Sequence, residues 1–94
     1  MDYAALIEVD NSGEDPEAGR RGLRDELLPA LRALPGFRSA LLLTAYERGR
    51  GVGVVVFDSR AAAEAVASGF SAGQQIREGV VVARTDVLEV SAAG

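Results

Sequence analysis

Two acidic residues of the first apolar segment, Glu8 and Asp10, could take part in acid–base chemistry or metal binding. Glu8 lies within a strand predicted over Tyr3–Val9, and Asp10 follows on the same face. Their Cα atoms would be about 7 Å apart, because a strand rises about 3.3 Å per residue. Two carboxylates at that distance can serve acid–base work or bind a metal ion. Glu8 stands in mid-strand, where a buried acid needs a partner, so we expect a salt bridge with Arg84 or Arg38.

The two tyrosines, Tyr3 and Tyr46, are the only phenols in the chain. A tyrosine in a pocket can orient a phenolic substrate or remove its proton, whereas a tyrosine at a strand end more often packs half-buried. Both interpretations stay open for Tyr46. Asn11 is the only asparagine and directly follows the first strand, so we expect it to form a turn.

Histidine and cysteine are absent from the sequence, which excludes several kinds of site. No serine or cysteine triad can be assembled, and neither thiolate metal sites nor disulfides can form. Carboxylates alone suit Mg²⁺ or Ca²⁺ at best, so we expect no transition metal, no haem and no other cofactor. Residues 49–53 are glycine-rich, but no helix follows them directly, and a tight hairpin explains them better than a phosphate site.

Composition favours one small globular domain over residues 1–94. Hydrophobic residues make up 48% and charged residues 26% of the chain, which argues against a disordered segment. A net charge of −4 and the absence of a basic stripe argue against nucleic-acid binding. The apolar runs are too short to cross a membrane and no signal peptide is visible, so we expect a cytoplasmic protein.

The hydrophobic periodicity predicts six elements in the order strand, helix, strand, strand, helix, strand. An N-cap at Asp15 with Pro16 begins the first helix, Pro29 should kink or restart it, and Pro35-Gly36 ends it. Ser59 should cap the second helix. Strands are predicted over 3–9, 37–46, 52–58 and 80–90, and 71–79 is expected to be a loop with at most one helical turn. This order is typical of an α+β, ferredoxin-like fold with a four-stranded antiparallel sheet.

The predicted hairpin strands are aliphatic on both faces. Leu41 and Leu42 point to opposite sides, and residues 54–57 repeat the feature. Two helices in so short a chain can cover only one face of the sheet. A second copy of the protein is the economical cover for the other face, so we expect a homodimer.

The segments LPGFRSALLL, GVGVVVFDSRAAAEA and VLEV resemble the dimeric α+β barrel superfamily. More narrowly, the chain is similar to antibiotic-biosynthesis-monooxygenase domains over residues 3–90. The resemblance implies two sheets packed face to face, and a cavity in each protomer between the sheet and its helices or loops. Haem-degrading members resemble one another through a functional Asn, Trp and His. This chain has Phe57 at the end of the third strand and no histidine, so haem degradation does not carry over.

Two functions from different classes remain open. The first is a cofactor-independent monooxygenase, or a related enzyme, that acts on an aromatic or polyketide-like small molecule. The second is a non-catalytic dimeric domain that binds a small apolar ligand or stabilises a partner; a regulatory domain that binds amino acids also stays open. The candidate ligand-binding residues are Glu8, Tyr46, Phe57 and Arg84.

Overall fold

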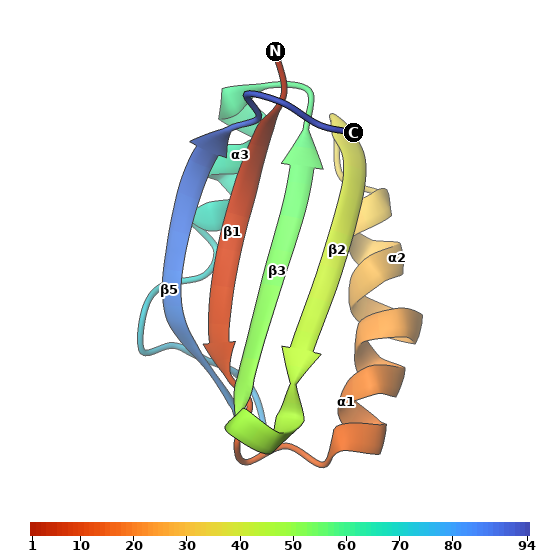
Figure 1. The fold of residues 1–94 in the computed structure, drawn as a ribbon, viewed down its shortest axis with the longest axis vertical. Helices are drawn as coiled ribbons and strands as arrows, with labels where there is room; N and C mark the ends of the chain where they lie inside the picture. The colour runs from red at the N-terminus through yellow and green to blue at the C-terminus, as the bar shows by residue number, and fades with distance from the viewer.

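A five-stranded antiparallel sheet forms one side of the protein, and the helices lie behind it (Figure 1). A computed structural model describes residues 1–94. The strand order in the sheet is β2-β3-β1-β5-β4. The strands are β1 (Tyr3–Asp10), β2 (Phe37–Ala45), β3 (Arg50–Phe57), β4 (Gln75–Arg77) and β5 (Val80–Glu89). The α+β class is therefore confirmed, and the arrangement is compatible with a ferredoxin-like fold.

The long helical segment between β1 and β2 changes its winding along its length. It consists of α1 (Pro16–Gly22), a π-helical turn (Leu23–Leu27) and α2 (Leu28–Arg32). The Asp15 carboxylate caps its start by accepting from the Ala18 N–H at 2.9 Å, as the sequence predicts. The Leu28 N–H donates to the Leu23 carbonyl, five residues back. The wider turn lies just before Pro29, so the predicted disturbance at this proline takes the form of a π turn.

The second helix, α3 (Arg60–Ala67), packs on β1, β3 and β5. Its N-cap is Ser59, whose hydroxyl accepts from the Ala62 N–H at 3.1 Å, as expected. Ala63 faces the sheet and is completely buried. A small side chain at this position lets the helix approach the strands closely. None of the helices has the length and apolarity needed to cross a membrane.

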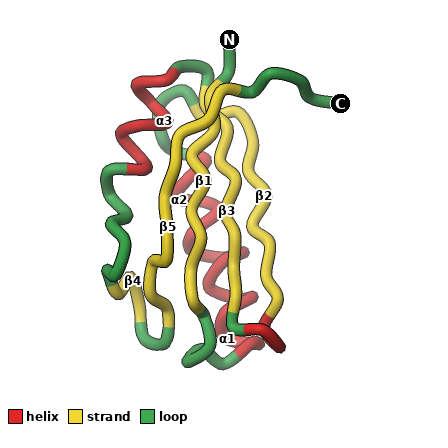
Figure 2. Tube along the Cα trace, turned by 60° about the vertical axis from the view of Figure 1, so that its left-hand side comes forward, coloured by secondary structure: helices red, strands yellow, loops and turns green.

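The sheet has a fifth strand that the sequence did not predict. Residues 71–79 were expected to form a loop, but β4 pairs with β5 through Gln75 and Arg77 (Figure 2). Three residues are too few to show the alternation that marks a strand in a sequence. The turn into β5 uses Gly79, whose φ of 79° is open to glycine and strained for other residues. A Cβ on Gly79 would also collide with the Gly13 backbone.

The core lies between the sheet and the helices. Leu31, Val55, Phe57 and Ala63 form its buried centre. The rings of Phe37 and Phe57 meet edge to face, with their centroids 6.3 Å apart. This contact joins the start of β2 to the end of β3. Phe57 is fully buried within this core.

The opposite side of the sheet, which we call the open face, is not covered by any element (Figure 1). The strand pairing aligns its residues in rows across β2, β3, β1 and β5. One row is Leu41, Val54, Leu6 and Asp86, and the next is Leu43, Val52, Glu8 and Arg84. Leu41 is 63% exposed, whereas Leu42 packs against the core on the other side. The prediction of strands that are aliphatic on both faces is therefore confirmed.

Candidate functional site

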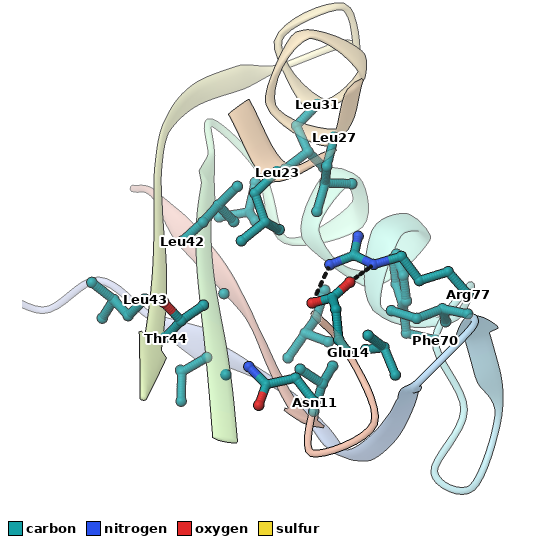
Figure 3. A pocket seen from close by; sticks show the side chains of 18 residues that line it. Asn11, Glu14, Leu23, Leu27, Leu31, Leu42, Leu43, Thr44, Phe70 and Arg77 are labelled. Carbon is teal, nitrogen blue, oxygen red and sulfur yellow. Dashed lines mark hydrogen bonds and ion pairs between the residues drawn. The ribbon is translucent and has the colours of Figure 1, made fainter. Parts of the chain in front are cut away.

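A cavity of about 70 Å³ lies between the sheet and the α1–α2 helix (Figure 3). At roughly 10–15 Å³ for each water-sized group, it has room for about five such groups. Its walls are mainly apolar, and its polar side chains come from Asn11, Glu14, Thr44 and Arg77. The apolar lining includes Ile7, Val9, Leu23, Leu27, Leu31, Leu42, Val55, Phe70, Ile76 and Val80. The lining, apolar with a few convergent polar groups, resembles that of small-molecule sites, but the volume is well below the roughly 300–1,000 Å³ of a pocket for a drug-sized ligand.

The helix and the sheet build this cavity through different features of the sequence. Leu23, Leu27 and Leu31 recur every four residues, so they form one face of the helix and line one wall. The facing wall contains Gly51 and Gly53 of β3. A Cβ on Gly53 would have no neighbour closer than 3.5 Å. The missing side chain at Gly53 therefore leaves part of the space between helix and sheet unfilled, whereas a Cβ on Gly51 would meet Val9 Cγ2 at 2.9 Å.

An ion pair closes one side of the cavity. Glu14, in the loop after β1, accepts hydrogen bonds from Arg77 of β4 (Figure 3). The Nη2–Oε1 distance is 3.2 Å, and Nε donates to Oε2. The Glu14 side chain is 8% exposed and that of Arg77 is 34% exposed. This two-bond geometry is the strong arrangement for arginine and carboxylate, and it ties two distant segments together.

Asn11 places a polar atom without a partner beside the cavity. The residue is 3% exposed, and its Nδ2 donates to the Arg50 carbonyl at 3.2 Å. Its backbone carbonyl accepts from the Glu14 N–H, so the expected turn role is confirmed. The side-chain Oδ1 is buried and has no hydrogen-bond partner. Turn propensity explains this asparagine in the sequence, and only the folded chain shows that it is buried.

Tyr46 lies near Glu14. Its hydroxyl is buried without a partner, and it does not line the cavity. The Tyr46 hydroxyl and Glu14 Oε1 are neighbours, because each lies within 2.6 Å of the place where a Cβ on Gly19 would stand. The Arg20 guanidinium lies 5.0 Å from the centre of the tyrosine ring. The absence of a side chain at Gly19 is what allows this close arrangement.

Glu8 lies on the open face and away from the cavity. Its carboxylate pairs with Arg50 at 3.0 Å, and the side chains are 25% and 59% exposed respectively. The expected salt bridge therefore exists, but the expected partners were wrong, because Arg38 pairs with Asp2 at 3.4 Å and Arg84 makes no ion pair. Arg50 reaches Glu8 diagonally from the neighbouring strand β3. That diagonal depends on strand register, which local sequence does not reveal.

The four predicted ligand-binding residues are not brought together in one site. Glu8 and Arg84 lie on the open face, Phe57 lies in the core, and Tyr46 lies near Glu14. None of them lines the cavity. Two of the four polar residues that do line it, Asn11 and Glu14, stand in the loop after β1, where the sequence shows only turn-forming residues.

Replacing Glu8 by glutamine should change the free energy of unfolding by less than about 1 kcal/mol. The pair is too exposed for a large effect, because solvent screens both charges. Thermal unfolding of Glu8→Gln beside the parent protein measures this change. A loss of several kcal/mol would show that a partner also buries the hairpin end of the open face, where this pair lies.

Asp10 and Ser12 form a small polar turn at the end of β1. The Ser12 hydroxyl and its backbone N–H, which donate at 2.6 and 2.9 Å, hold the pKa of Asp10 below its ordinary value of 3.8. This interaction stabilises the folded state above about pH 4 and is lost as the pH falls through the lowered pKa. In Ser12→Ala the pKa of Asp10 should rise toward its ordinary value, as followed by NMR titration of the carboxyl carbon. An unchanged pKa would contradict the role of the hydroxyl.

No group of three or more acidic, histidine or cysteine residues is placed to hold a metal ion. The candidate site is an apolar cavity, and Asn11, Glu14 and Arg77 form its polar end. No protein-family model matches the chain, and no curated protein matches it.

Proposed function

We propose that this protein is a dimeric small-molecule-binding domain of the dimeric α+β barrel type, similar to antibiotic-biosynthesis-monooxygenase domains. The cavity carries the proposal: it is apolar, it lies between sheet and helix, and a buried carboxylate and a buried amide line it. A ligand held there would exchange water for aliphatic contacts on most sides.

The open face supports the dimer. Four strands about 4.8 Å apart and eight residues long present roughly 26 by 19 Å, or about 500 Å² in projection. Because side chains protrude from the sheet, the accessible area of the open face is larger than its projection. That area comes near the roughly 800 Å² that each partner buries in an interface of standard size. The centre of the face is apolar, and its charges lie toward the hairpin end and on the edge strand β5. These features suit a second copy of the same sheet.

Light scattering at micromolar concentration tests the dimer directly. The chain has a mass of 9.8 kDa, so the expected particle has about twice that mass. A single-chain mass at all concentrations would refute the dimer and the barrel with it, and would leave the cavity as a site of a monomer.

The second candidate function is a cofactor-independent oxygenase, as the resemblance implies. The observation that favours it is a buried carboxylate, Glu14, in an apolar cavity, because such chemistry needs a group that removes a proton from the substrate. The cavity of about 70 Å³ is smaller than the roughly 150 Å³ that holds benzene, so it must open further to admit even a single ring. Oxygen consumption with single-ring dihydroxy-aromatic compounds should then exceed that of heat-denatured protein. Ligand binding without oxygen consumption would favour the non-catalytic function.

A further inference from the structure

The polar side chains of the cavity lining leave few free hydrogen-bonding positions inside the cavity. Glu14 and Arg77 bond to each other through two hydrogen bonds. The Asn11 Nδ2 donates to the Arg50 carbonyl, and its Oδ1 is buried among protein atoms with almost no surface of its own. Thr44 is exposed to solvent. A hydroxyl or amine brought into the cavity would lose its water partners without gaining equal ones, which costs free energy.

Aliphatic side chains and a glycine form the rest of the walls. Leu23 and Leu27 from the helix and Leu42 from β2 converge on the space (Figure 3). Gly53 of β3 lies on the facing wall, and the atom nearest to its Cβ position is Leu42 Cδ2 at 3.5 Å. Water binds weakly in such a place, because it needs about two to four polar partners. The chemistry of the walls therefore favours an apolar ligand.

The volume of the cavity sets the size of that ligand. A cavity of roughly 150 Å³ holds benzene, which corresponds to about 25 Å³ for each carbon atom. A packed carbon atom thus takes more room than the minimum for a water molecule. The cavity of about 70 Å³ has room for about three heavy atoms without any movement of its walls.

We propose that the cavity, with its walls as they stand, takes an apolar molecule of about three heavy atoms, such as a short hydrocarbon. Its carbon atoms contact Leu23, Leu27 and Leu42 and fill the place left open at Gly53. This assignment rests on the proposed ligand-binding function and narrows its ligand class. It selects against molecules of the same size that carry a hydroxyl, and against single rings unless the cavity opens.

Propane and ethanol form a matched pair of probes, since they have the same number of heavy atoms and differ by a hydroxyl in place of a methyl. The protein, labelled with ¹³C at its leucine methyl groups, is titrated with each probe. Propane should shift the signals of Leu23, Leu27 and Leu42 saturably, with a Kd on the order of 1 mM for so small a ligand. The signals of Leu41 and Leu88, which are exposed and do not line the cavity, should not move. Ethanol should bind about tenfold more weakly.

Gly53→Ala tests the position of the ligand. The added methyl group meets no atom closer than 3.5 Å, so the variant should fold, and it takes the room of about one heavy atom of the ligand. The affinity for propane should fall about tenfold. Gly69→Ala is the matched control, because its Cβ has no neighbour closer than 3.4 Å and Gly69 does not line the cavity. Thermal unfolding shows whether both variants are folded.

The outcomes separate this assignment from the ligand-binding function on which it rests. Ethanol that binds as tightly as propane would overturn the apolar assignment, and an unchanged propane affinity in Gly53→Ala would overturn the position. Toluene that binds at the same leucines more tightly than propane would show that the cavity opens, and would overturn the size. In each of these cases the ligand-binding function stands. Failure of propane, ethanol and toluene alike to bind would remove that function itself.

Discussion

Leu41→Arg should give a folded monomer, whereas Leu42→Arg should unfold the protein. Leu41 is 63% exposed on the open face, so an arginine there stays solvated in the monomer. In the proposed dimer the same arginine would be buried against the apolar face of the partner. Burial of about 800 Å² per partner corresponds to a gross hydrophobic free energy of about 20 kcal/mol in each half of the interface. The entropy lost on association and the ordering of side chains offset most of this free energy. One arginine from each copy at the centre should therefore abolish the dimer. Light scattering measures the mass, and circular dichroism the fold.

Leu42 lies one residue further along and packs against the core and the cavity. A charge there loses its hydration without a partner, and the expected cost of about 3–5 kcal/mol is comparable to the whole stability of a small domain. Ala61→Arg, on the exposed side of α3, is the matched control and should remain a folded dimer. A dimer that survives Leu41→Arg would show that the open face is not the interface.

Arg77→Met should lower the free energy of unfolding by about 2–3 kcal/mol, because it leaves the buried Glu14 carboxylate without its partner. Loss of a fully buried partner costs more, but Arg77 is about one third exposed and solvent screens part of the effect. For a domain of this size the melting temperature should fall by roughly 10–20 °C. Thermal unfolding followed by circular dichroism gives the value.

A double-mutant cycle separates the pair from general loss of packing. The second change, Glu14→Gln, removes the unpaired charge, so the double variant should be more stable than Arg77→Met alone. Arg48→Met is the control, since the Arg48 Nε lies 4.0 Å from the Glu47 Oε1 and both side chains are exposed. Its effect should stay within about 0.5 kcal/mol. If Arg77→Met behaves like this control, the ion pair does not hold the cavity closed.

Local signals in the sequence predicted the elements well, because each depends on neighbouring residues. Asp15 and Ser59 cap their helices with bonds to the residue three positions on. The glycine at position 49 has a φ of 64° and turns the hairpin between β2 and β3. The short strand β4 was missed because pairing with β5, rather than its own pattern, makes it a strand.

The candidate site was largely hidden in the sequence. Glu14 and Arg77 are 63 positions apart, and Glu8 and Arg50 are 42 apart. Such pairs depend on strand register, and register itself is irregular here, because the pairing of β5 with β1 shifts between Val82 and Arg84. A sequence shows which residues are charged, but not which charge will lie beside which.

The sequence by itself determined the order of the elements, their caps and the aliphatic character of both sheet faces, since periodicity and capping act over a few residues. Only the tertiary structure decided that the cavity lies beside Asn11 and Glu14 rather than beside Glu8, Tyr46, Phe57 or Arg84. The reason is that burial and ion pairing are properties of segments distant in the chain. Those segments meet only once the sheet has its register and the helix lies across it.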